Sequence, residues 1–176
     1  MKYAQVFICD VANGPGCRTS LFVSGCTHHC KECFNEVAWD FSYGKDFTPE
    51  VEDMLISETN HPYISGITIL GGEPMEVVNQ KALRPFIERV RQELPDKDIW
   101  IYSGYTWEEL NDANNQRCHS EDTDAILSMI DVLVDGEFVA AQKNVSLTFR
   151  GSTNQRIIDV PQTRANGAIV LSQYNG

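Results

Sequence analysis

The sequence lacks any apolar run of the length that a membrane span needs. Residues 1–10 also lack the basic, apolar and small-residue segments of a secretory signal peptide. Basic residues are few, because 14 Lys and Arg stand against 25 Asp and Glu, which gives a formal charge of −11. Phosphate binding needs clustered Lys and Arg, so this charge argues against nucleic acid as a main partner. We therefore expect a cytoplasmic protein that acts on neither membranes nor nucleic acid.

The chain has 176 residues, of which 42% are hydrophobic, and this size favours a single domain over residues 1–176. Strand patterns alternate with helix patterns, which is typical of a parallel sheet with helices outside it. A full eight-stranded barrel takes ~250 residues. We therefore expect an α/β fold in the form of an open, partial (βα) barrel.

Local signals place the expected elements along the chain. Strands are predicted over residues 3–9, 19–23, 64–70, 99–102 and 132–134. One helix is predicted to start after Thr48 as cap, with Pro49 at the first helical position, and another to span 83–94, with Pro85 in its first turn. A third is predicted to start at the capping box of Thr106 and Glu109, and a fourth to end at 126–130. The polar segment of about 111–123 is expected to be a surface loop. The extension of about 160–176 is expected to add a short strand at 168–171.

Six cysteines are present, and three of them, Cys26, Cys30 and Cys33, lie within eight residues in a C-x3-C-x2-C spacing. In a cytoplasmic chain a disulfide framework is not expected. Clustered thiolates are typical of metal or redox chemistry. The scattered Cys9, Cys17 and Cys118 are expected to serve as small apolar residues.

Three cysteine ligands leave one iron of a [4Fe–4S] cluster open for a substrate, whereas electron-transfer clusters usually have four cysteines. This open position favours catalysis. The alternative is a zinc site made by the three cysteines and either His28 or His29, which lie between the first two cysteines. Such a site would make the chain a zinc-binding interaction module.

A second motif, Gly71-Gly72-Glu73-Pro74, follows the predicted strand 64–70. Ligand sites in barrels and open α/β sheets lie at the carboxyl ends of the strands. Two glycines allow the backbone to approach a ligand closely, and a carboxylate there can accept a hydrogen bond from an ammonium group. Alone this run is an ordinary turn, but after the cysteine triplet it indicates a cofactor site.

The two motifs resemble those of the radical S-adenosylmethionine enzymes, which share a C-x3-C-x2-C cluster loop and a Gly-Gly-Glu-Pro-like strand end. Over roughly residues 3–159 the chain further resembles the anaerobic ribonucleotide reductase activating proteins. The segments that carry this second resemblance are Asn13–Gly16, Leu21–Asn35, Tyr102–Tyr105, Val134–Phe138 and Arg150–Gln155. Glu32 departs from the superfamily, many of whose members have an aromatic residue there, and from the activases, which commonly have a small one.

The resemblance implies that Cys26, Cys30 and Cys33 hold three irons of a [4Fe–4S] cluster and that S-adenosylmethionine chelates the fourth. The Gly71–Pro74 strand end would receive its amino group. A one-electron donor such as flavodoxin would reduce the cluster, and cleavage of a sulfur–carbon bond would give a 5′-deoxyadenosyl radical. That radical would take a hydrogen from the glycine-radical loop of the partner, anaerobic ribonucleotide reductase. Close alternatives are an activase for another glycyl-radical enzyme and a small-molecule radical enzyme.

The remaining candidates have supporting roles, and no side chain is expected to act as a catalytic acid or base. Ser103 and Asp135 lie at strand ends. Ser103 is assigned to the methionine carboxylate or the ribose of the ligand, and Asp135 to the adenosyl ligand or the partner's glycine loop. Arg150 is assigned to an acidic group of the partner. Other residues are assigned to shaping the cluster loop or packing beside it: His28, His29, Trp39, Phe41 and the turn Asn13–Gly16.

Overall fold

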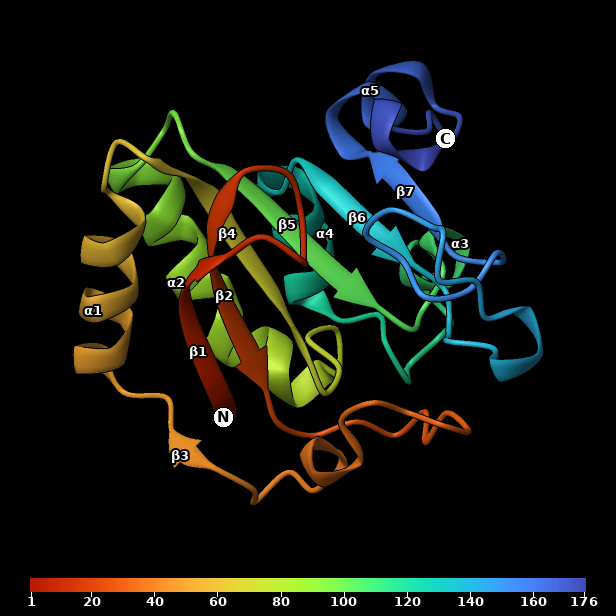
Figure 1. Cartoon of the computed structure of the whole chain (residues 1–176), viewed down its shortest axis with the longest axis horizontal. Helices are drawn as coiled ribbons and strands as arrows, with labels where there is room; N and C mark the ends of the chain where they lie inside the picture. Colours follow the sequence, from red (N-terminus) through yellow and green to blue (C-terminus); the bar gives the residue numbers. More distant parts are fainter.

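The computed structural model describes all of residues 1–176 and contains one seven-stranded sheet (Figure 1). The strands lie side by side in the order β3-β1-β2-β4-β5-β6-β7. Their bounds are Lys2–Asp10 for β1, Cys17–Val23 for β2, Lys45–Asp46 for β3, Ile64–Gly71 for β4, Asp98–Ser103 for β5, Val132–Asp135 for β6 and Arg156–Asp159 for β7.

The centre of the sheet is parallel and consists of β2, β4, β5 and β6. The flanking strands β1, β3 and β7 run antiparallel to their neighbours. The predicted α/β class is confirmed, and the sheet is open. The sequence patterns do not predict β3 or β7, because strands of two and four residues are too short to show a period.

Helices cover one face of this sheet (Figure 1). Their bounds are Pro49–Thr59 for α1, Val77–Glu93 for α2, Trp107–Leu110 for α3, Glu121–Met129 for α4 and Val160–Asn166 for α5. Short 3-10 turns span Glu36–Trp39, Ala140–Gln142 and Gln173–Asn175. The capping box at Thr106 and Glu109 is confirmed. None of the helices combines the length and the apolar composition that crossing a bilayer requires.

The main core lies between the sheet and the helices, since alternate strand residues such as Ile67 and Ile69 point toward α2 and α4. The opposite face holds a buried cation, Arg18, which is 0% exposed. Arg18 donates to Thr68 Oγ1 at 2.8 Å and pairs with Asp98 at 2.5 Å, and its guanidinium lies 5.3 Å from the ring centroid of Trp100. This pairing and stacking offset the cost of burying the charge.

Helix α2 begins earlier than predicted, at Val77, so the expectation that Pro85 lies in a first turn is wrong. The first turns of α2 are held by hydrogen bonds from buried polar side chains, and an apolar periodicity does not predict such turns. Asn79 Nδ2 donates to Ser24 O at 3.0 Å, and Gln80 Nε2 donates to Cys118 O at 2.6 Å. Pro85 therefore lies inside a helix of 17 residues.

The segment 111–123 is only partly the surface loop that was expected. Its last residues form the start of α4, with Ser120 as a cap that accepts from Asp122 N. Cys118 is 0% exposed and belongs to the main core, as expected for a small apolar residue. The predicted strand at 168–171 is wrong, because only one isolated bridge, Ile158 to Leu171, forms there.

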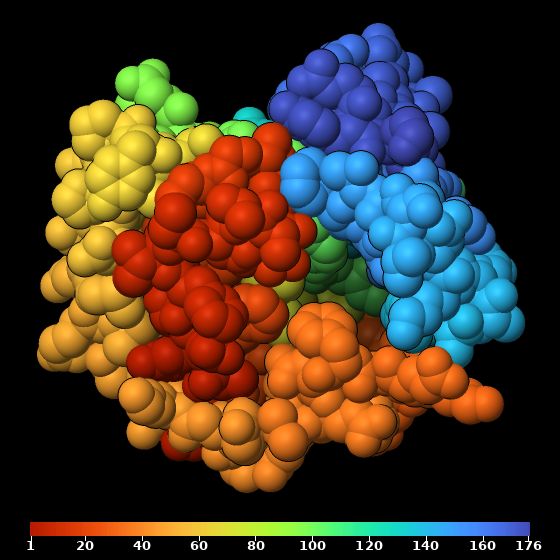
Figure 2. Space-filling view, in the orientation of Figure 1, coloured from red at the N-terminus to blue at the C-terminus, as the bar shows by residue number.

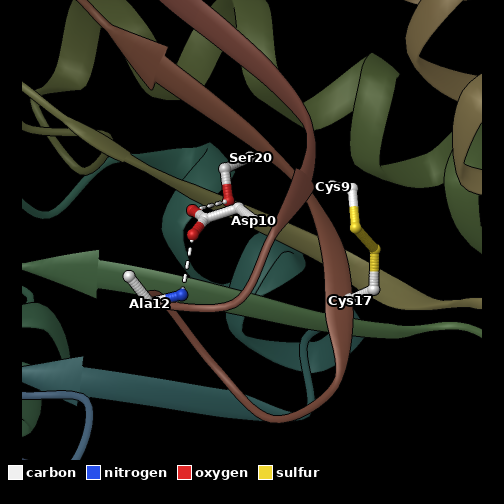
Figure 3. Close-up of a disulfide and its surroundings, with 5 residues drawn as sticks. All are labelled: Cys9, Asp10, Ala12, Cys17 and Ser20. Carbon is white, nitrogen blue, oxygen red and sulfur yellow. Dashed lines mark hydrogen bonds between the residues drawn. A yellow bond between two sulfur atoms is a disulfide. The ribbon is translucent and has the colours of Figure 1, made fainter.

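Cys9 and Cys17 form a disulfide between β1 and β2, which corrects the expectation that both are unpaired (Figure 3). Their Cα atoms lie 5.1 Å apart. The hairpin brings together residues eight positions apart in sequence, and the spacing alone does not predict that pairing.

Candidate functional site

The loop that carries the clustered cysteines follows β2 at the carboxyl end of the parallel strands. Backbone hydrogen bonds fasten it, since Gly25 N donates to Ala38 O at 2.8 Å and Cys26 N donates to Trp39 O at 3.1 Å. Glu73 N, just after β4, donates to Gly25 O at 2.8 Å. The cysteine loop and the Gly-Gly-Glu-Pro strand end are therefore in direct contact.

Cys26, Cys30 and Cys33 are free thiols that line one cavity with the strand end Gly71–Glu73. Cys26 is buried, and the other two are half-buried. The backbone N–H of Asn35 donates to Sγ of Cys33 at 3.4 Å. The fold thus gathers three soft ligands beside a glycine-rich strand end.

The donor set consists of soft sulfur ligands, which suit an iron–sulfur cluster. Burial raises the pKa of the Cys26 thiol to about 12, and the Glu73 carboxylate adds to the rise. A thiolate at that position therefore needs a bound cation to balance its charge.

Two glycines let the strand end approach the cysteine loop. Gly71 has a φ of +112°, and a Cβ there would lie 2.7 Å from Val23 N. A Cβ on Gly72 would lie 2.6 Å from the carbonyl oxygen of Gly25. Larger residues at either position would push the two motifs apart. Pro74 is buried and leads the chain toward α2.

Glu73 is 1% exposed, and its carboxylate is surrounded by donors. Oε1 accepts from Met75 N and from Ser103 Oγ, each at 2.8 Å. Oε2 accepts from Gly104 N at 2.6 Å and lies 3.0 Å from Nε2 of His28. Ser103, which the sequence assigns to the methionine carboxylate or the ribose, therefore supports Glu73 in the structure.

His28 joins the cysteine loop to two carboxylates, a role that the sequence does not reveal. Its Nε2 faces Glu73, and its Nδ1 lies 2.5 Å from Oε1 of Glu137. Burial lowers the pKa of His28, but the hydrogen bonds to Glu73 and Glu137 outweigh burial and raise it above 6.5. Both ring nitrogens can donate only in the imidazolium form. The assignment of His28 to shaping the loop fits this geometry.

The aromatic residues assigned to packing lie against the same loop. The His29 ring lies 4.6 Å from that of Trp39, centroid to centroid. The Phe41 ring covers Gly25, where an added Cβ would lie 2.2 Å from Cδ1 of Phe41. These aromatic contacts pack against the cysteine loop, as predicted for Trp39 and Phe41.

Asp135 is 1% exposed and is already engaged. Its Oδ2 accepts from Trp107 N at 2.7 Å and from Arg156 at 2.5 Å. The Asp135 carboxylate first, and then the Glu108 carboxylate, raise the pKa of Arg156. Asp135 also lines a polar hollow with Gly104. Its assignment to the adenosyl ligand or the glycine loop therefore stays a prediction.

Arg150 differs from the sequence expectation of a partner-binding cation. Its guanidinium donates to the carbonyl oxygens of Gln155 and Asn175, both at 2.6 Å. The side chain is half-buried. Arg150 therefore ties the 150–155 turn to the end of the chain.

Arg117, in the polar segment 111–123, reaches the cysteine loop. It donates to Thr27 Oγ1 at 3.2 Å and lies 5.1 Å from the Tyr105 ring centroid. Thr27 is held from the other side by Glu76, which accepts from Thr27 N at 2.7 Å. No motif in the sequence connects Arg117 with Thr27, because the contact spans 90 positions.

A second, larger cavity of about 460 Å³ opens beside Cys30 and Cys33. Figure 2 shows the hollow bounded by the β1–β2 hairpin in red, the cysteine loop in orange and residues 140–155 in light blue. Ala12 and Asn13 contribute to its wall, which agrees with a turn at Asn13–Gly16 beside the cysteines. Much of the lining is apolar, including Phe138 and Phe149.

The fold and the cysteine cavity agree with an iron–sulfur protein. A family model described as "4Fe-4S single cluster domain" matches residues 12–158. The chain is 44% identical over 159 residues to the anaerobic ribonucleoside-triphosphate reductase-activating protein of Vibrio cholerae, covering 89% of this chain and 97% of that one. It is 41% identical over 157 residues to the Escherichia coli K12 protein of that name, covering 88% and 96%. The protein of that name from Enterobacteria phage T4 is 35% identical over 159 residues, covering 89% and 93%. The chain belongs to the family of anaerobic ribonucleoside-triphosphate reductase-activating proteins.

Proposed function

We propose that this protein is a radical S-adenosylmethionine activase, with Cys26, Cys30 and Cys33 as the ligands of a [4Fe–4S] cluster. Its target is the anaerobic ribonucleotide reductase, on which it installs a glycyl radical. The reaction takes place in the cytoplasm, with a one-electron donor such as flavodoxin. The open sheet then corresponds to a shortened, partial barrel of the radical S-adenosylmethionine type.

One observation carries this proposal: the three free cysteines and the Gly71–Glu73 strand end line the same cavity. The chain's family and the 4Fe-4S description of its matching model add independent support. Three cysteine ligands leave one iron for a substrate. The neighbouring carboxylate and close backbone give that substrate a polar anchor.

The bound cluster would supply the electron that cleaves S-adenosylmethionine, and the chain's own residues would bind and orient that molecule. Glu73 is the acceptor for its ammonium group, beside the backbone of Gly71 and Gly72. Ser103 and Gly104 hold the Glu73 carboxylate in place from β5. Asp135 faces the polar hollow next to Gly104, where ribose hydroxyls find acceptors.

The apolar cavity beside Cys30 and Cys33 is the entry for the partner's glycine loop. Two large apolar side chains of its lining stay exposed, Phe34 at 82% and Val145 at 91%. Exposed apolar groups at the mouth of a cavity are typical of protein contact sites. A glycine loop bound there lies next to the cysteines and excludes water from the radical.

The test is anaerobic reconstitution with iron and sulfide, followed by reduction with dithionite in the presence of S-adenosylmethionine. We expect near-equal iron and sulfide and formation of 5′-deoxyadenosine. With the partner reductase added, a glycyl radical should be seen by electron paramagnetic resonance. A protein that assembles no cluster, or that cleaves no S-adenosylmethionine when loaded, would overturn the proposal.

The partner entry is tested separately with Phe34→Ser and Val145→Ser. Both variants should lower the yield of the partner's radical several-fold, because a truncated apolar contact typically costs about 1 kcal/mol of binding. Formation of 5′-deoxyadenosine without the partner should not change. Tyr63→Ser is the matched control, since Tyr63 is 62% exposed and does not line the cavity.

A further inference from the structure

The Cys9–Cys17 disulfide lies at the base of the loop that forms one wall of the cavity beside Cys30 and Cys33. Cys9 is exposed and Cys17 is half-buried, so the pair can be reached from solvent. The loop between them, residues 10–16, carries Ala12 and Asn13 into the cavity lining. Opening or closing the Cys9–Cys17 bond therefore acts on a loop whose residues Ala12 and Asn13 line the cavity beside Cys30 and Cys33.

The backbone pairing is irregular where the disulfide forms. Phe7 pairs with Ser20 and Asp10 with Arg18, so two residues of β1 face only Thr19 between these pairs. The register of β2 against β4 also shifts between Cys17 and Arg18. A bulge leaves part of the ladder unpaired. The disulfide thus joins the strands beside an irregular part of the ladder.

The loop has a second, non-covalent fastening on the other side of the hairpin (Figure 3). Asp10 accepts from Ser20 Oγ at 2.6 Å, from Ala12 N at 2.8 Å and from Asn13 Nδ2 at 2.6 Å. Thr68 Oγ1 donates to Asn13 O at 2.9 Å. These bonds fasten the loop independently of the disulfide, so we expect its reduction to change the mobility of the loop and not the fold.

We propose that Cys9 and Cys17 form a reversible thiol–disulfide exchange site for a dithiol reductant, and that the redox state of the pair sets the mobility of the loop 10–16. In a cytoplasmic protein a disulfide is usually transient, because the compartment keeps thiols reduced. The significance of the mobile loop for catalysis rests on the proposed function. The exchange itself needs neither cluster nor S-adenosylmethionine.

Reduction of the pair follows ordinary thiol–disulfide exchange. A thiolate of the dithiol attacks Sγ of the exposed Cys9, the Cys9–Cys17 bond breaks, and Cys17 leaves as a thiolate that takes up a proton. The second thiolate of the reductant then attacks the reductant's other sulfur, which is bonded to Cys9 in the mixed disulfide, and Cys9 leaves as a thiolate that takes up a proton. Two electrons and two protons pass to the protein, and the dithiol becomes a cyclic disulfide.

The sequence allows a direct assay. Trypsin cleaves after Lys2 and Arg18, so Cys9 and Cys17 fall on one peptide, 3–18, that contains no other cysteine. The full chain, prepared without oxygen and without denaturant, is incubated with reduced or oxidised dithiothreitol and then alkylated. We expect two alkyl groups on peptide 3–18 after reduction and none after reoxidation. The cluster cysteines lie on other peptides, so loss of the cluster cannot be mistaken for this exchange.

Hydrogen exchange on the same samples tests the link to the loop. Amides of residues 11–16 should exchange several-fold faster in the reduced protein, and the Cys9→Ser/Cys17→Ser variant should match the reduced form in both buffers. A pair that excess reduced dithiothreitol leaves intact in the folded protein would overturn the proposal, as would equal exchange at 11–16 in both states. Either result leaves cluster assembly and 5′-deoxyadenosine formation as a separate question.

Discussion

The Nε2 atom of His28 lies 3.0 Å from Oε2 of Glu73, so a residue between two cluster cysteines holds the carboxylate that we assign to S-adenosylmethionine. Both side chains are almost fully buried, at 3% and 2% exposure. Glu73 also accepts from Met75 N, Ser103 Oγ and Gly104 N. The carboxylate is therefore a structural acceptor before any ligand binds.

Glu73→Gln should destabilise the cluster-free chain, because an amide NH2 replaces one acceptor oxygen and faces two donors. We expect a loss of about 2 kcal/mol, the typical cost of leaving buried donors unpaired. Urea unfolding without oxygen measures it. Glu137→Gln is the control, since its side chain is 49% exposed and its amide oxygen can still accept from His28. An equal loss of stability in both variants would contradict the inference that the Glu73 carboxylate is the main acceptor for the surrounding donors.

Changing Cys26, Cys30 or Cys33 singly to Ser should abolish assembly of the [4Fe–4S] cluster while the fold survives. The physical reason is that two thiolates cannot hold three irons. Iron and sulfide assays with visible absorption measure the outcome. Cys118→Ser is the control, because Cys118 lies in the core and its Sγ contacts only Glu109 O in hydrogen-bond range. Full assembly in any one of the three variants would remove that residue from the ligand set.

Arg117→Ala should loosen the cysteine loop with little effect on overall stability. Arg117 is exposed and contacts Thr27 and the buried Tyr105 ring, and a cation–π contact from an exposed cation is worth about 0.5–1 kcal/mol. Faster hydrogen exchange at residues 27–29 is the expected signal. Arg117→Lys keeps the charge but loses the planar stacking, so its exchange rate at residues 27–29 should lie between those of the wild type and the Ala variant. Unchanged exchange in the Ala variant would mean that Glu76 alone fixes Thr27.

Asp10 should make the β1–β2 loop sensitive to acid. Burial opposes its ionisation, but hydrogen bonds from Ser20, Asn13 and Ala12 together hold its pKa below 3.8. A depressed carboxylate pKa contributes stability that is present above the unfolded value and lost as the pH falls through the folded one. The free energy of unfolding should therefore drop more steeply from about pH 5 to pH 3 in the wild type than in Asp10→Asn. Equal slopes would show that Asp10 ionises alike in both states.

Much of the fold can be predicted from the sequence, because strands such as β5 and β6 carry short apolar runs and the Thr106 capping box marks the start of α3. The first turns of α2 cannot, because buried Asn79 and Gln80 replace the apolar stripe that marks a helix. The short β3 and β7 depend on their neighbours for pairing. Local patterns cannot predict elements that exist only through distant contacts.

The sequence by itself determined the cysteine spacing, the glycine-rich strand end and the family resemblance, since these are properties of neighbouring residues. Tertiary structure alone decided which donors surround Glu73, that Cys9 meets Cys17, and that Arg117 reaches Thr27. The reason is physical: spacing along the chain fixes which groups are available locally. Packing fixes which distant groups approach within hydrogen-bond or covalent distance.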